Sequence, residues 1–212
     1  MVEISFNTII NNTSTDGGGG ISCQDANPTI DNNLIVGNAS GLYGGGIYCE
    51  FSSPGILNCT IAYNDGGAYG GALACYTQSG PKVTNSIIRG DLPDEIYTDE
   101  IFPKVSYSNV QGGYAGLGNI DANPMFVNQS GGDFHLKQAP CQLLPMDAGN
   151  PCVDAGDPEY TVIGSTRTDA IKDSGLPDMG YHYPAITVFS PGTGFLEEGG
   201  EDKKPELEST PR

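Results

Sequence analysis

The stretch Gly18-Gly19-Gly20-Ile21-Ser22-Cys23 decides the fold, because the chain repeats it twice. It returns as Gly44-Gly45-Gly46-Ile47-Tyr48-Cys49 and again as Gly70-Gly71-Ala72-Leu73-Ala74-Cys75, with a step of 26 residues each time. A fixed period of roughly 20 to 50 residues is the signature of a repeat architecture. The sequence therefore predicts a solenoid of similar coils.

Two further blocks keep the same phase between these stretches. One block places an aliphatic residue at an equivalent position in each copy: Ile9, Ile35, Ile61, Ile88 and Val110. Within the blocks apolar residues alternate with others, which is the period of β-strands. Parallel crossovers are almost always right-handed. We therefore expect an all-β fold, a right-handed single-stranded parallel β-helix with three short strands per coil of about 26 residues and about five coils.

Stacking of such coils places equivalent side chains in columns. We expect Ile9, Ile35 and Ile61 to lie above one another in the core, and Cys23, Cys49 and Cys75 to form a column of packed thiols. At a corner of the coils, the amides of Asn32, Asn58 and Asn85 are expected to bond side chain to side chain along the stack.

Charge and hydropathy exclude two classes of partner. Nine Lys and Arg against 26 Asp and Glu give a net charge of −17, which repels nucleic acids and anionic lipids. No apolar run approaches the roughly 18 residues of a membrane-spanning helix. We expect neither nucleic-acid binding nor membrane insertion.

A second kind of motif follows the repeats. It comprises Asp154-Ala155-Gly156-Asp157-Pro158 and then Asp178-Met179-Gly180-Tyr181, with His182 between the two last aromatic residues. Residues 1–184 resemble bacterial right-handed parallel β-helix repeat proteins, a pectate-lyase-like group that includes choice-of-anchor Q surface proteins. Members usually carry Glu where this chain has His182. The resemblance implies an exported or cell-surface protein and no particular reaction.

The expected organisation has three parts. Residues 1–111 form the coils, residues 112–184 form a C-terminal cap, and residues 185–212 form one more strand and an acidic disordered tail or linker. Apolar residues of the second part are expected to cover the open end of the solenoid: Phe126, Phe134, Leu136, Met179, Tyr181 and Tyr183.

The start of the chain already stands in repeat register and carries no signal peptide. We therefore expect a C-terminal piece of a longer protein, with upstream β-helix coils as its neighbours. The signal peptide is expected in the missing part, and the location is extracellular or at the cell surface.

Two groups of residues are weak candidates for catalysis on a polysaccharide. A lyase needs a basic or calcium-bridged site, and the basic candidates are Lys82, Arg89 and Lys104. A glycoside hydrolase needs paired carboxylates, and an acidic loop supplies Asp91, Asp94, Glu95, Asp99 and Glu100. Both groups are also typical of solvated surfaces, and we favour that interpretation.

Metal and disulfide sites are open alternatives in the C-terminal part. Calcium prefers carboxylate oxygens, and the candidates are Asp154, Asp157, Asp169, Asp173 and Asp178. The same side chains also bond their own turns without a metal. Cys141 and Cys152 can form a disulfide in an oxidising compartment. No other cofactor is expected.

Three functions remain open at this point. The first is a noncatalytic module that offers exposed aromatic residues to a carbohydrate, to a cell-envelope component or to an adhesion partner. Its candidates are Tyr43, Tyr48, Tyr63, Tyr69 and Tyr76. The second is part of a polysaccharide lyase or glycoside hydrolase whose catalytic coils lie upstream. The third is a structural spacer.

Overall fold

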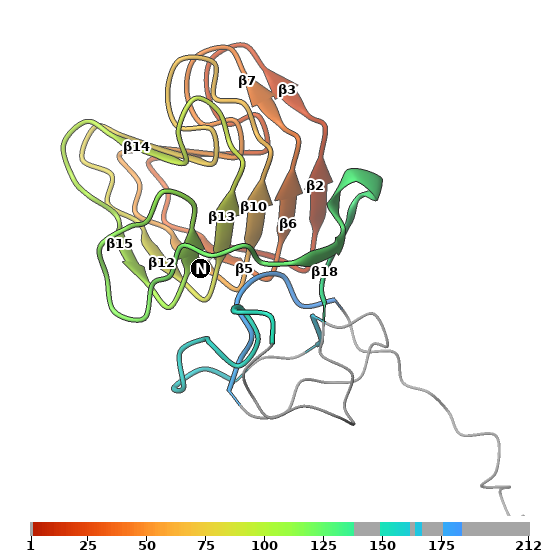
Figure 1. Cartoon of the computed structure of the whole chain (residues 1–212). Coiled ribbons are helices and arrows are strands. Elements are labelled where there is room, and N and C mark those ends of the chain that lie inside the picture. Colours follow the sequence, from red (N-terminus) through yellow and green to blue (C-terminus); the bar gives the residue numbers. More distant parts are fainter. Residues whose placement is uncertain (1, 138–148, 162–163, 167–175, 184–212) are drawn as a thin grey trace, which may run out of the picture.

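The computed structural model describes residues 2–137, 149–161, 164–166 and 176–183, and its regular part is a parallel β-solenoid of about four turns (Figure 1). Three parallel sheets form its walls. The first wall contains β1 (Glu3–Ser5), β5 (Thr29–Asp31), β9 (Gly55–Leu57), β12 (Lys82–Thr84) and β15 (Lys104–Ser106). The second wall contains β2 (Thr8–Ile10), β6 (Leu34–Val36), β10 (Thr60–Ala62), β13 (Ile87–Arg89) and β16 (Asn109–Val110).

The third wall contains β4 (Ile21–Gln24), β8 (Ile47–Glu50), β11 (Leu73–Tyr76) and β14 (Ile96–Thr98). The short strands β3 (Thr13–Ser14) and β7 (Ala39–Ser40) pair at a corner. The expected all-β parallel β-helix is confirmed. Because the third wall has four strands and the other two have five, the last coil, with β15 and β16, has no strand in the third wall.

The core lies between the walls and follows the repeat register. Ile61 pairs with Ile35 on one side and with Ile88 on the other, and Ile35 pairs with Ile9. Ile35, Ile61 and Ile88 are fully buried. The column of Ile side chains is thus confirmed, and each coil buries its apolar face against its neighbours.

The cysteine column is also as expected. Cys49 pairs with Cys23 on one side and with Cys75 on the other, and all three are buried free thiols. The glycine runs form the preceding corner. At Gly44 the φ angle is +59°, and an added Cβ atom would lie 2.4 Å from the carbonyl oxygen of Ile47. Only glycine fits this corner without strain.

The asparagine ladder differs from the expected one. Asn12, Asn38 and Asn64 form it: the Nδ2 atom of Asn12 donates to Oδ1 of Asn38 at 3.0 Å, and Asn38 donates in the same way to Asn64. Of the three amides that we expected to bond along the stack, Asn85 does donate to Asn58 at 3.3 Å. Asn58 donates to Asp31 instead, at 2.8 Å. Asn32 is not part of this chain of bonds, because its side chain bonds the backbone of His182.

The end of the solenoid is closed by residues 112–121. The backbone N–H of Val110 donates to the carbonyl oxygen of Ile120 at 3.0 Å, and Tyr107 N–H donates to that of Leu117 at 2.7 Å. Tyr114 packs against the core beside them. These contacts satisfy the strand edge that we expected the later aromatic residues to cover.

The apolar residues of the following segment lie elsewhere than expected. They pack on the outer face of the second wall, against Leu34, Ala62 and Ile87, and comprise Phe126, Phe134, Leu136, Met179 and Tyr181, with Tyr183 partly buried beside them. Leu34, Ala62 and Ile87 adjoin the inward Ile35, Ile61 and Ile88, so they point outward. The expected end cap is therefore a lateral cover over an apolar wall. The antiparallel strands β17 (Phe126–Asn128) and β18 (Asp133–Leu136), joined by the 3-10 turn η1 (Gln129–Gly131), form its first part.

Backbone hydrogen bonds fasten the second part of this cover. The Oδ1 atom of Asn32 accepts from the N–H of His182 at 2.6 Å, and Gly180 N–H donates to the carbonyl oxygen of Asn85 at 2.7 Å. His182 is fully buried. The strand and tail expected at 185–212 lie outside the described residues, and among the described residues no helix could span a membrane.

Candidate functional site

Five tyrosines lie along the outer face of the third wall and its adjoining corner. We call them the tyrosine row: Tyr43, Tyr48, Tyr69, Tyr76 and Tyr97. The ring of Tyr43 stacks on that of Tyr69, with centroids 5.2 Å apart and planes at 17°. Its centroid also lies 5.7 Å from that of Tyr48 and 5.1 Å from that of Tyr76. Tyr69 continues the row to Tyr97 at 4.6 Å.

The coil register produces this row. Alternation along β8 turns Ile47 and Cys49 inward and Tyr48 and Glu50 outward. Tyr43 and Tyr69 are equivalent residues of successive coils and form a parallel bridge. Tyrosines at equivalent positions must therefore stack along the solenoid, about 4.8 Å apart in the backbone.

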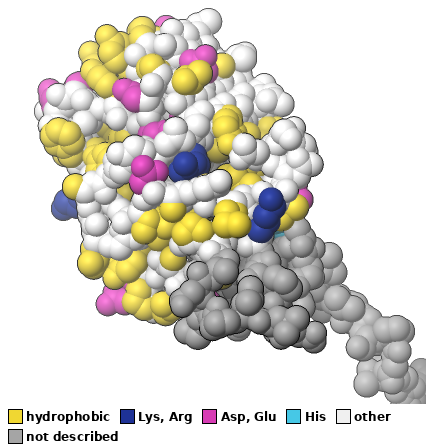
Figure 2. All heavy atoms as spheres, in the orientation of Figure 1, with side chains coloured by type: hydrophobic (Ala, Val, Ile, Leu, Met, Phe, Trp, Pro, Cys, Tyr) yellow, Lys and Arg dark blue, Asp and Glu magenta, His cyan; other side chains and the backbone are white. Residues whose placement is uncertain are grey.

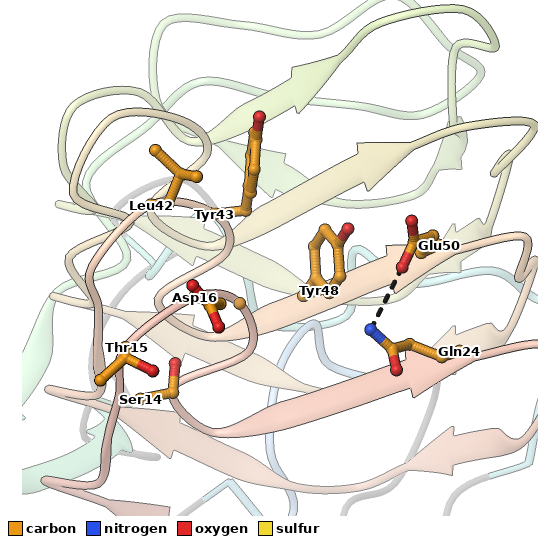
Figure 3. A pocket seen from close by; sticks show the side chains of 9 residues that line it. Ser14, Thr15, Asp16, Gln24, Leu42, Tyr43, Tyr48 and Glu50 are labelled. Atoms are coloured by element: carbon orange, nitrogen blue, oxygen red, sulfur yellow. Dashed lines mark hydrogen bonds between the residues drawn. The ribbon is translucent and has the colours of Figure 1, made fainter.

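A cavity of about 510 Å³ opens at one end of the tyrosine row. It is lined by the corner residues on one side and by the outer face of β4 and β8 on the other (Figure 3). The lining residues are Ser14, Thr15, Asp16, Gly17, Gln24, Leu42, Tyr43, Tyr48 and Glu50. Polar groups beside aromatic rings in a concave site are typical of ligand pockets. We call this cavity the tyrosine pocket.

Two carboxylates give the tyrosine pocket its charge. Asp16 is exposed, and Glu50 is half-buried and accepts a hydrogen bond from Nε2 of Gln24 at 3.1 Å (Figure 3). Burial and the neighbouring Glu50 carboxylate raise the pKa of Tyr48 to about 12. The described lining contains no Lys or Arg, so its formal charge is negative.

Tyr48 points outward as expected, but its side chain is only 7% exposed. The turn at Gly17 lies against its ring, since a Cβ atom at Gly17 would be 2.8 Å from it. Tyr63 is 40% exposed and lies apart from the row, with its ring centroid 6.2 Å from that of Phe134. The structure thus places the two tyrosine candidates in different surroundings.

The three basic candidates lie on two different walls. Lys82 and Lys104 are exposed neighbours on β12 and β15 of the first wall. Arg89, on the second wall, donates to the carbonyl oxygen of Ala122 at 3.0 Å and lies 3.5 Å from an Oδ1 atom of Asp121. On the face drawn in Figure 2, the visible Lys and Arg side chains are likewise separated from one another. Arg89 therefore does not join the two lysines in one basic spot.

The acidic candidates bond the backbone of neighbouring residues. Asp94 accepts from Gly70 N–H at 2.8 Å, Asp99 accepts from Thr77 N–H at 3.1 Å, and Glu100 accepts from Gln78 N–H at 3.2 Å. Glu95 accepts from the N–H groups of Gly90 and Asp91. These carboxylates satisfy backbone N–H groups where the last coil is shorter than the others.

Asp91 ends the asparagine ladder. Its Oδ1 atom accepts from the N–H and from Nδ2 of Asn64, both at 2.8 Å. Its Oδ2 atom is buried and has no hydrogen-bond partner among the described residues. Burial and the adjacent Glu95 carboxyl raise the pKa of Asp91 well above its ordinary value. Burial beside Glu95 therefore favours the neutral form of this carboxyl group over the charged one.

Of the calcium candidates, Asp169 and Asp173 lie outside the described residues. The carboxylate of Asp178 accepts from Asp154 N–H at 2.7 Å and from the hydroxyl of Thr166. The Oδ1 atom of Asp157 accepts from Glu159 N–H at 3.0 Å. Among the described residues no group of three potential metal ligands comes together. Calcium binding remains a prediction.

Cys152 is buried, and its Sγ atom accepts from Nδ2 of Asn109 at 3.0 Å. Its expected partner, Cys141, lies outside the described residues, so the disulfide also remains a prediction. His135 is half-buried: its ring stacks on Tyr183 at 3.5 Å, and its Nδ1 atom lies 2.6 Å from Asp133.

Sequence reasoning missed Asp16, Gln24, Glu50 and Tyr97 as members of one site. The signal was present in the repeat, since Gln24, Glu50 and Tyr76 occupy one column at the end of the third wall. Reading the outward residues of the coils as columns would have grouped them with Tyr48.

Comparison with known proteins identifies one family. The model of the right handed beta helix region matches residues 2–121, which is more than half of the chain. Neither a curated protein nor a solved structure matches the chain.

Proposed function

The chain belongs to the right-handed β-helix family, and on that premise we propose that it is a noncatalytic module that binds a polysaccharide through its tyrosine row. The observation that carries this proposal is the row of stacked rings along the third wall, which ends in the tyrosine pocket. The binding takes place outside the cell, in keeping with the resemblance of the chain to exported β-helix proteins.

The geometry of the rings supports a chain-like ligand. Tyrosine rings offer flat apolar faces with a polar edge, and such surfaces suit partners that are apolar on one side and hydrated on the other. Sugar rings have this character. Tyr43 and Tyr69 occupy equivalent positions of successive coils, with ring centroids 5.2 Å apart, a spacing comparable with the length of one sugar unit. A polysaccharide that runs along the solenoid would therefore meet one ring after the other.

The acidic loop supports a noncatalytic role. A hydrolase needs two carboxylates free to act on the substrate, one as an acid and one as a base or nucleophile. Asp91, Asp94, Glu95, Asp99 and Glu100 each accept at least one backbone N–H bond. We infer from these hydrogen bonds that the carboxylates hold the backbone of the last coil in place.

The test compares two tyrosines of nearly equal exposure. Tyr69, in the row, is 39% exposed, and Tyr63, outside it, is 40% exposed. We expect the chain to be retained by neutral polysaccharides in affinity electrophoresis and Tyr69→Ala to weaken this retention at least about tenfold, which is about 1.4 kcal/mol. Tyr63→Ala serves as the matched control and should leave it unchanged. Equal losses in the two variants, or no retention by any polysaccharide, would overturn the proposal.

A further inference from the structure

We propose that the tyrosine pocket selects amino sugars, so that the ligand is a polysaccharide whose units carry protonated amines. This inference rests on the proposed function and adds the substrate class. It is carried by the placement of Asp16 and Glu50 beside Tyr43 and Tyr48 in one cavity (Figure 3).

The first argument is charge. Asp16 comes from the corner and Glu50 from the end of β8, so two carboxylates border the cavity from different elements. The basic residues Lys82, Lys104 and Arg89 lie on the other two walls. With a net charge of −17 on the chain, the field around the pocket concentrates cations and repels uronic acids.

The second argument is that the aromatic residues favour the same ligand. Tyr43 is half-buried and lines the pocket next to both carboxylate-bearing elements, with its ring stacked on those of Tyr48 and Tyr69. An amino sugar combines an apolar ring face with a charged amine, so it can satisfy both kinds of group at once.

The third argument is the arrangement of Glu50. Gln24 donates to its Oε2 atom, which fixes the carboxylate at the outer face of the third wall. A carboxylate has about four acceptor positions, so Glu50 keeps capacity for a ligand donor. A charge-assisted bond between an ammonium group and a carboxylate is stronger than a neutral one. The pocket therefore holds a preoriented acceptor for an amine.

The test uses calorimetry on the full chain at mildly acidic pH with three probes: a glucosamine hexasaccharide, its fully N-acetylated counterpart and oligolysine. We expect the amine-bearing sugar to bind at least about tenfold more tightly than the acetylated one. We also expect it to bind more tightly than oligolysine, and added salt to weaken the binding of both cationic probes more than that of the acetylated sugar.

Two conservative variants locate the effect. The double variant, with Glu50→Gln and Asp16→Asn, should lose the preference for the amine-bearing sugar and keep the binding of the acetylated sugar. Glu159→Gln, which neutralises an exposed carboxylate outside the pocket, is the matched control and should keep the preference.

The outcomes separate the two proposals. Equal binding of both sugars would overturn the amine selection and leave polysaccharide binding intact. Binding of neither sugar would overturn the amino-sugar assignment, while the affinity electrophoresis with neutral polysaccharides decides the proposed function separately. Binding of oligolysine as tight as that of the amino sugar, lost in the same double variant, would overturn the amino-sugar assignment in favour of a cationic peptide.

Discussion

Two outer faces of the same solenoid differ in what covers them. On the second wall, Leu34, Ala62 and Ile87 point outward. The C-terminal segment packs over them with Met179 and Tyr181 and buries them. The third wall carries the tyrosine row; the described part of the C-terminal segment packs on the second wall instead, and the turn at Gly17 lies against Tyr48. Its outward side chains combine rings with Gln24 and Glu50.

The difference follows from the chemistry of the side chains. Leu, Ile and Ala have no polar atoms, so a contiguous patch of them is stabilised by burial of about 25 cal/mol per Å². Tyrosines tolerate contact with water through their hydroxyl groups. The covered wall therefore contributes to folding, and the open wall is available for a ligand.

The largest expected effect comes from the core beneath both faces. Ile61→Asp buries an unpaired carboxylate in a fully buried column, which should cost several kcal/mol and unfold the solenoid. Circular dichroism and thermal melting measure this loss. Both faces should be lost together, since each rests on the same column.

Lys82→Ala is the surface control for this variant. Lys82 is exposed on the first wall, so its truncation should cost less than about 0.5 kcal/mol. Similar losses of melting temperature in the two variants would contradict the placement of Ile61 in the buried core.

The second effect should separate the two faces. Gly180 has a φ angle of +97°, and a Cβ atom there would lie 2.8 Å from both the Cδ1 atom of Ile87 and the Oγ1 atom of Thr60. We expect Gly180→Ala to cost about 1–3 kcal/mol through backbone strain alone, and more through this clash. Hydrogen exchange should quicken in residues 176–183, while ligand binding on the third wall stays unchanged.

Gly112→Ala provides a matched control, because Gly112 has a φ angle of +82° and an added Cβ atom there meets nothing within 4 Å. The Gly112→Ala variant therefore has the strain of a positive φ angle but no steric clash of the added Cβ atom. If Gly180→Ala behaves like Gly112→Ala, or if it also weakens ligand binding, the separation of the two faces is wrong.

The repeat allowed the inward columns to be predicted from the sequence, because Ile35 and Ile61 stand 26 residues apart in identical surroundings. The open face was predicted only in part: Tyr48 was expected among the exposed aromatic residues, but its packing under the Gly17 turn depends on a neighbouring coil. The lateral cover was misplaced. The pairing of His182 with Asn32 spans 150 residues, and no local pattern encodes such a contact.

The outward apolar residues were nonetheless a usable signal. Leu34 precedes Ile35 and Ile87 precedes Ile88, so one wall is apolar on both faces. A strand that is apolar on both faces is buried on both faces. Applied to the repeat, this rule would have placed the C-terminal segment on the second wall.

A smaller effect is expected at the corner between the two faces, where Asp91 ends the asparagine ladder. Its pKa is raised above the ordinary 3.8 by burial and by Glu95, so the folded state keeps a proton that the unfolded state releases. The free energy of unfolding should therefore fall as the pH rises from the ordinary value through the raised one.

Asp91→Asn places at this corner the residue type of the preceding coils, Asn38 and Asn64. We expect it to remove this pH dependence and to stabilise the protein at neutral pH, because the amide carries no charge to bury. Urea unfolding at a series of pH values measures the free energy of unfolding of this variant, with Glu159→Gln as the control. An unchanged slope would mean that Asp91 is charged in the folded protein.

The smallest effect is expected from calcium removal, which concerns the covered face alone. The carboxylates of Asp178 and Asp157 already accept hydrogen bonds from backbone N–H groups, at 2.7 Å from Asp154 and at 3.0 Å from Glu159. If these bonds suffice to hold the turns, an excess of chelator should leave the melting temperature where a matched monovalent salt control places it. The control is needed because a chain with a net charge of −17 also responds to screening. A ligand that binds only the folded state stabilises it by mass action, so a rise in melting temperature specific to calcium would make the covered face a metal site, and its attachment would then depend on the ion as well as on its apolar contacts.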